Sequence, residues 1–151
     1  MYKKSAVHYI AKAVVDILFY LSLLCTAAVP FVARWVFGWI GYTDSRYLIL
    51  FSAVIFLSGI GCAYILFCLK QMYKTLLVGN PFIASNVEQL RRIAVACAMI
   101  AALYVAKSVI AFTFAAMVIS FVFIVGSLFC LTLKDLFKQA INYKTENELT
   151  I

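Results

Sequence analysis

Two ionisable residues, Asp16 and Lys107, lie inside long apolar stretches of the sequence, where a charge is costly and often functional. A carboxylate in such a place could carry a proton, because burial raises its pKa toward neutrality. Asp16 lies one helical turn after Lys12, and we expect these two side chains to pair. Lys107 lies fifteen residues after Arg92, about 22 Å along a helix, so its amine is expected to snorkel to the opposite surface. Asp16 and Lys107 should therefore lie near opposite membrane faces and not pair with each other.

Other residue types that commonly do chemistry form no recognisable site. His8 is the only histidine, and the sequence arranges no acid or nucleophile around it. The five cysteines lie in apolar stretches without a C-x-x-C pair, so we expect them to pack as small hydrophobic residues. No glycine-rich phosphate loop is present. The sequence therefore predicts no enzyme, no catalytic residue, no metal site and no cofactor.

The elements that must position these residues are four apolar stretches, each close to the 20 or so residues that cross a bilayer core of about 30 Å. The chain has 151 residues, of which 66% are hydrophobic and 13% are charged. Soluble domains carry about 25% charged residues. The sequence predicts an all-α integral membrane four-helix bundle that forms a single domain, with spans at 13–33, 47–69, 93–111 and 114–133.

The positive charges indicate how these spans are oriented. Ten of the 13 lysines and arginines precede the first span, lie in the loop 70–92, or lie in the tail 134–151. This bias places both termini and the central loop in the cytoplasm of a multi-pass cell-membrane protein. Orientation and contact with anionic lipid account for the net charge of +7, so we expect no direct binding of nucleic acid.

Two polar segments carry helix signals of their own. Ser85-Asn86-Val87-Glu88 has the spacing of a capping box, which predicts a helix that begins near Ser85 and continues through Arg91 and Arg92 into the third span. The segment after the fourth span is amphipathic. Its apolar stripe, which either lies on the membrane surface or docks on another element, consists of Leu133, Leu136, Phe137, Ala140 and Ile141.

Small residues recur every fourth position in the third span, at Ala94, Ala98, Ala102 and Ala106. This spacing lets helix backbones approach closely. Two alternatives stay open, packing within the bundle and a face that forms a homo-oligomer.

Two polar segments also resemble a known family. Gly79-Asn80-Pro81-Phe82, followed by Asn86-Val87 and Leu90-Arg91-Arg92-Ile93, is similar to the central loop of the YoaS-like family of small bacterial four-helix membrane proteins, a domain of unknown function. The tail from Leu136 to Ile151 resembles the terminal motif of that family, although Glu148 stands where an aspartate is more usual.

The resemblance implies no established activity. It implies that a gene for a small DNA-binding protein of the helix-turn-helix class is often found next to the gene of the membrane protein. This association suggests that the membrane protein sequesters such a regulator or senses a signal for it. We hypothesise that these two segments form one cytoplasmic surface that binds such a partner. The alternative is that the same segments only pack on each other and close the bundle. The residues of this hypothetical surface are Asn80, Pro81, Phe82, Leu90, Arg91, Phe137, Glu146, Asn147, Glu148, Leu149, Thr150 and Ile151.

A different class of function remains open beside the regulatory hypothesis. The chain could be a small transporter that uses Asp16, or an immunity protein against membrane-active peptides. Asp16 lies only about 6 Å past Lys12 at 1.5 Å per residue, whereas transport favours a carboxylate near the midplane.

Overall fold

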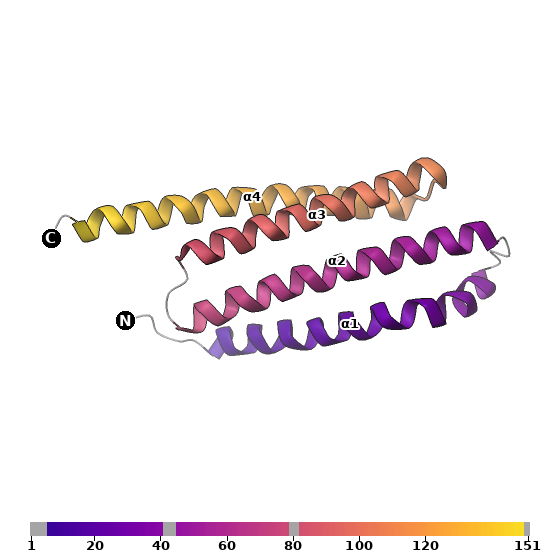
Figure 1. Cartoon of the computed structure of the whole chain (residues 1–151), viewed down its shortest axis with the longest axis horizontal. Helices are drawn as coiled ribbons and strands as arrows, with labels where there is room; N and C mark the ends of the chain where they lie inside the picture. The colour runs from indigo at the N-terminus through magenta and orange to yellow at the C-terminus, as the bar shows by residue number, and fades with distance from the viewer. Residues whose placement is uncertain (1–5, 41–44, 79–81, 150–151) are drawn as a thin grey trace.

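The computed structural model describes residues 6–40, 45–78 and 82–149, and nearly all of them lie in four α-helices. The helices are α1 (Ala6–Ile40), α2 (Ser45–Val78), α3 (Ala84–Ile110) and α4 (Phe114–Leu149). They run antiparallel in sequence order, so the start of α1, the end of α2, the start of α3 and the end of α4 lie at one end of the molecule (Figure 1). We name this end the terminal end, and the opposite one the far end. The all-α four-helix prediction is confirmed.

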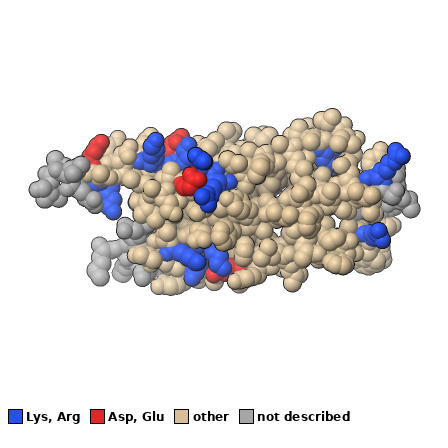
Figure 2. Space-filling model, in the orientation of Figure 1, with Lys and Arg blue, Asp and Glu red and all other residues tan. Residues whose placement is uncertain are grey.

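Each of the four helices is long and apolar enough to cross a membrane. The shortest has 27 residues and the longest has 36, against the 20 or so that a bilayer core requires. Charged side chains gather toward the two ends of the visible face and leave an uncharged zone between them (Figure 2). These features are those of a multi-pass membrane protein whose helices continue beyond the hydrocarbon region.

The helices form an open bundle in which each packs on its neighbour in sequence. α1 packs on α2, α2 on α3, and α3 on α4, while among the described residues no close backbone approach joins α1 to α4. α3 is therefore the most enclosed helix and α1 the least. A small core between α2, α3 and α4 is built around Cys68, Ile93 and Cys97.

Two glycines let α2 approach helices on both of its sides. A Cβ atom at Gly59 would lie 2.5 Å from Thr26 Oγ1 of α1, and one at Gly61 would lie 2.8 Å from Ile100 Cδ1 of α3. At Gly59 the new atom would press on the short, branched side chain of Thr26 down to its Cβ, whereas at Gly61 only the end of the Ile100 side chain would have to move. The close approach of α1 to α2 thus depends on the missing side chain at Gly59.

The alanine row of α3 does not act as one packing face. Ala94 is buried and its carbonyl accepts a hydrogen bond of 2.8 Å from Ser127 Oγ of α4, but Ala98, Ala102 and Ala106 are exposed. α3 has neighbours on two sides, so its buried positions do not follow a single four-residue spacing. The homo-oligomer alternative stays a prediction for the three exposed alanines.

The start of α3 differs from the predicted capping box. Ile83 is the N-cap residue and makes no side-chain hydrogen bond at the cap. Ser85 lies one position inside the helix, where its backbone is already helical and cannot act as a cap. Glu88 instead pairs with Arg91 at 3.5 Å and with Arg92 at 3.3 Å, so the capping-box prediction is wrong.

Three helices extend beyond their predicted spans, and α2 ends at Val78 instead of Leu69. α1 continues through Pro30 to Ile40. α4 runs without interruption from the apolar region through the tail, so the amphipathic segment is the last part of α4 and not a separate helix. The break between α3 and α4 is short and covers 111–113, next to the boundary that the sequence places between 111 and 114.

Candidate functional site

The α2–α3 connection and the last part of α4 meet at the terminal end. The rings of Phe82 and Phe137 lie 5.3 Å apart between centroids, at an angle of 50°. Phe137, Ala140 and Ile141 are half-buried, whereas Leu136 of the same predicted stripe is exposed. The stripe therefore docks on another element, and Leu136 lies outside the contact.

Two polar side chains strengthen this junction. Asn86 is buried at 2% exposure, and its Oδ1 accepts a hydrogen bond of 2.9 Å from Thr75 Oγ1 of α2. Leu90, one turn further along α3, is also buried, at 4% exposure. At Leu90 the structure thus favours the alternative in which these segments pack on each other.

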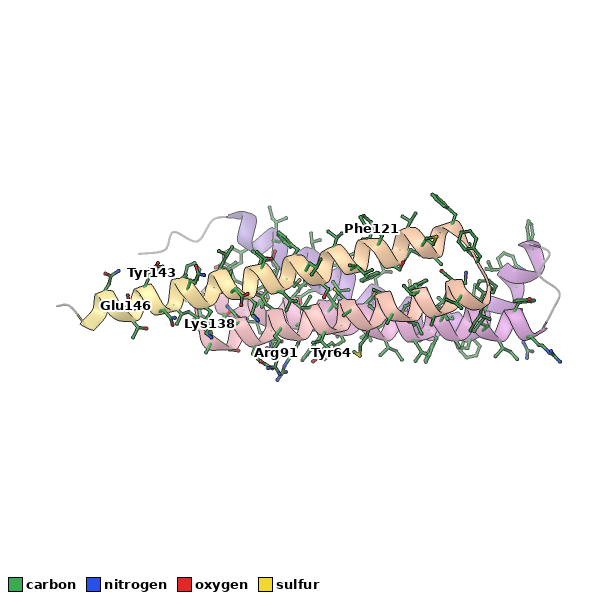
Figure 3. All side chains as sticks on the ribbon, turned by 90° about the horizontal axis from the view of Figure 1, so that it is seen from above. Tyr64, Arg91, Phe121, Lys138, Tyr143 and Glu146 are labelled. Atoms are coloured by element: carbon green, nitrogen blue, oxygen red, sulfur yellow. The ribbon has the colours of Figure 1, made fainter. Side chains whose placement is uncertain are left out.

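Arg91 lies on a different face from Leu90 and is exposed. It forms a charged cluster with Glu88 and Arg92 on the surface of α3. Tyr64 of α2 lies near Arg91 on the same face of the molecule (Figure 3). This cluster lines a different pocket from Phe137, so the residues of the hypothetical surface do not all lie together.

The end of α4 projects from the bundle. Residues 142–147 are helical and exposed, including Glu146 and Asn147. Lys138, Tyr143 and Glu146 follow one another along this projecting part (Figure 3). Glu148 and Leu149 belong to α4, but their side chains, like that of His8, lie outside the described residues, as do Asn80, Pro81, Thr150 and Ile151 altogether.

Asp16 pairs with a lysine of another helix. Its Oδ1 lies 3.0 Å from Nζ of Lys70, and that amine also lies over the rings of Phe19 and Tyr20, at 5.3 and 5.0 Å from their centroids. The predicted pair with Lys12 is therefore wrong. A lysine that precedes its acidic partner by four residues is the weaker order within a helix, and the antiparallel packing of α1 and α2 supplies Lys70 directly opposite.

Lys107 does not snorkel to the surface, and that prediction is also wrong. The residue is 5% exposed, its Nζ donates a hydrogen bond to Thr113 Oγ1, and the same atom lies 4.3 Å from the ring centroid of Phe51. The α3–α4 turn brings the Thr113 hydroxyl within hydrogen-bond reach of the buried amine. Lys107 thus joins α2, α3 and the turn at the far end.

Sequence reasoning missed a groove between α2 and α3. It has a volume of about 750 Å³, and its walls are mostly apolar, with Tyr64, Glu88, Arg91 and Arg92 at one end. In the sequence, the adjacent Arg91-Arg92 pair belongs to the basic loop that predicts the orientation in the membrane. Only the packing of α2 on α3 places an apolar groove beside that pair.

The described residues form no cluster of metal-ligating side chains. Among them, no group of three or more histidine, cysteine, aspartate or glutamate side chains is arranged to hold a metal ion. The five cysteines are free thiols, of which Cys68 and Cys97 are buried in the core. Burial of Cys68 and Cys97 in the core assigns these two thiols to helix packing.

Comparison with known proteins leaves the activity open but defines the family. No curated protein and no solved structure matches the chain. One family model, described as a protein of unknown function (DUF2975), matches residues 4–151, which is nearly the whole chain. The membrane protein with four long apolar helices described here thus belongs to the DUF2975 family.

Proposed function

We propose that the protein is a non-enzymatic membrane anchor that presents the end of α4 to a small cytoplasmic protein. The observation that carries this proposal is that α4 continues past the ends of α2 and α3 as an exposed helix (Figure 1). Its base is held by the Phe82–Phe137 contact, while residues 142–147 are exposed. A helix that is fixed at its base and exposed along its tip suits recognition by the groove of a partner.

The cytoplasmic location of this tip belongs to the same proposal. The terminal end carries most of the basic residues, while the far end has Arg34, Arg46 and Lys107. The bias of basic residues toward the cytoplasm supports an orientation with both termini inside. Under that orientation α4 projects where soluble regulators are found.

The class of partner comes from the family resemblance described above. A small helix-turn-helix regulator is the expected partner, and this membrane protein would hold it away from DNA without contacting DNA itself. The projecting segment contains both signs of charge, at Lys144 and Glu146, and an exposed aromatic ring at Tyr143. Exposed aromatic residues beside polar ones are typical of binding hot spots.

The transport alternative receives less support from the same geometry. Asp16 is engaged with Lys70 near the terminal end, whereas a carrier needs an ionisable group that is free to change its partner near the midplane. An immunity role has no feature of its own in the described residues. The docking proposal is therefore the one that we develop.

The test is a crosslinking pull-down of the full-length protein from its own membranes, with point variants that leave the bundle intact. Tyr143→Ala and Glu146→Lys alter the projecting part of α4. Phe121→Ala is the matched control, because Phe121 is 66% exposed on the same helix but lies within the apolar region. We expect the native chain and the Phe121→Ala variant to recover a small DNA-binding protein in equal amounts. Its recovery should fall several-fold with the two tail variants.

Equal recovery with all four chains would contradict docking through α4. Recovery that falls equally with Phe121→Ala would indicate that the capture depends on the membrane-embedded region instead. Absence of any partner, together with ion or solute uptake that Asp16→Asn abolishes, would replace the proposal with the transport alternative.

A further inference from the structure

The groove between α2 and α3 has two chemically different parts. Its volume of about 750 Å³ lies in the range of about 300–1,000 Å³ that is typical of small-molecule sites. Most of its length is lined by aliphatic and thioether side chains, among them Leu57, Ile60, Val95, Met99 and Leu103. The charged cluster of α3 closes one end.

That charged end retains capacity for an anion. The side chains of Arg91 and Arg92 are 65% and 50% exposed, and both pair with the single carboxylate of Glu88. Two guanidinium groups against one carboxylate leave one net positive charge. Each guanidinium has five N–H donors in a planar fork, and one carboxylate shared by two guanidinium groups cannot accept from all of them. The planar fork also fits the oxygen atoms of a phosphate, which can accept two parallel hydrogen bonds from it.

The length of the groove matches one leaflet of a bilayer. Arg92 and Leu103 are eleven residues apart on α3, which is about 16 Å along a helix and about half of a hydrocarbon core of about 30 Å. Arg91 and Arg92 lie toward the terminal end of α3, at the depth where the apolar part of the helix begins. The charged end is thus at headgroup level when the apolar part lies in the hydrocarbon.

We propose that this groove is a binding site for one anionic phospholipid, with its phosphate on Arg91 and Arg92 and an acyl chain along Ile60, Met99 and Leu103. Basic pockets between membrane helices are known to recognise anionic headgroups. A zwitterionic lipid supplies the same chain without the net negative charge. An apolar partner helix would cover the groove but leave the two arginines without an anionic partner.

The lipid site and the docking of α4 are independent of each other. The groove is formed by α2 and α3, whereas the proposed docking segment is the projecting part of α4. The lipid site also makes no use of the Phe82–Phe137 contact. Either proposal can fail while the other stands.

The test is native mass spectrometry of the full-length protein, titrated with phosphatidylglycerol or with phosphatidylcholine of the same chains. We expect saturable binding of one phosphatidylglycerol and binding of phosphatidylcholine about tenfold weaker. In the double variant R91Q/R92Q the preference should fall by about tenfold, since each basic contact contributes a severalfold gain in affinity. Lys138→Gln is the matched control, because this exposed lysine lies on α4 outside the groove, and it should leave the preference unchanged.

The acyl chain is located by a phosphatidylglycerol that carries a photoreactive group near the end of one chain. We expect labelling of α2 and α3 peptides around Leu57 and Leu103, and loss of this labelling in R91Q/R92Q. These two arginines are exposed, so the double variant is expected to fold, and its circular dichroism provides the check.

Several outcomes would overturn the lipid site. One is equal binding of the two lipids to the native chain, and another is an equal loss with Lys138→Gln, which would indicate general surface attraction. Competition by inorganic phosphate as effective as that by the lipid would show that the apolar groove contributes nothing. A dimer that excludes the photoreactive lipid from the groove would show that a second copy of the chain covers it.

Discussion

At the level of single residues, the ion pair between Asp16 and Lys70 joins α1 to α2 at the terminal end. We expect Asp16→Asn to lower the free energy of unfolding by about 1 kcal/mol, because the two side chains are partly exposed and solvent screens their attraction. A double-mutant cycle with Lys70→Gln should give a coupling energy of about 0.5–1 kcal/mol. Reversible unfolding in bicelles provides the measurement.

Lys12 is the control for this cycle, because it lies on the same helix as Asp16 and one turn away. The variant Lys12→Gln should show no coupling with Asp16→Asn beyond about 0.3 kcal/mol. A coupling as large as that of Lys70 would show that Asp16 pairs along α1 instead of across to α2.

Lys107 leads to a second prediction at this scale. Thr113→Val removes the hydroxyl that accepts a hydrogen bond from the buried amine, so we expect a loss of about 1–3 kcal/mol in the free energy of unfolding. Lys107→Met replaces the charge with an apolar side chain of similar length and should be neutral or stabilising. In that background, Thr113→Val should cost much less, as measured by the same unfolding experiment.

The comparison between backgrounds is what distinguishes the two roles of Thr113. An equal loss in both would mean that the threonine supports the α3–α4 turn and not the amine. Its carbonyl accepts backbone hydrogen bonds from Ala116 and Met117, and Thr113→Val leaves that carbonyl in place, so the substitution tests the side chain alone.

At the level of helices, the contact of α1 with α2 depends on Gly59. Gly59→Ala would place a Cβ atom 2.5 Å from Thr26 Oγ1, 3.0 Å from Thr26 Cγ2 and 3.2 Å from Thr26 Cβ, so no rotation of the threonine side chain clears all three contacts. We expect a loss of about 1–3 kcal/mol from overpacking, measured as unfolding in bicelles. Gly38→Ala is the matched control, since nothing lies within 4 Å of a Cβ atom there.

The control should be neutral or slightly stabilising, because alanine favours a helix over glycine by about 0.5–1 kcal/mol. If both alanine variants have the same effect, helix propensity alone explains the result and the close approach of α1 to α2 has no energetic weight.

At the level of the whole molecule, the arrangement predicts that the two ends of the bundle face different compartments. We expect Lys144→Cys to react with a membrane-impermeant thiol reagent in inside-out vesicles, and Arg46→Cys to react in intact cells. The physical reason is the excess of basic residues at the terminal end, because short loops rich in lysine and arginine are generally kept in the cytoplasm. Labelling of the unmodified chain measures the contribution of its own cysteines, and labelling of both variants from one side would contradict the four-span arrangement.

The sequence predicted the four helices well, because the length and apolarity of a membrane helix are local properties. The break at 111–113 follows from the same local signals, since two long apolar helices must be joined within a stretch of 41 residues in which Lys107 is the only charge. The start of α3 was also predicted closely, near Ser85 against the observed Ala84, but its capping interaction was not. Ser85 and Glu88 have the spacing of a cap, but the helix begins one residue before Ser85, and Glu88 pairs with Arg91 and Arg92.

By itself, the sequence determined that this is an all-α membrane protein with four spanning helices, because the length of each apolar stretch depends only on consecutive residues. Tertiary structure alone decided the ionic partner of Asp16 and the location of the groove. Lys70 lies 54 residues from Asp16 in the chain, and Arg92 lies 28 residues from Tyr64, so no local pattern relates them. They meet because α1, α2 and α3 pack antiparallel in a register that glycines at the contacts permit, and a register between helices is a property of surfaces that fit together, not of either helix alone.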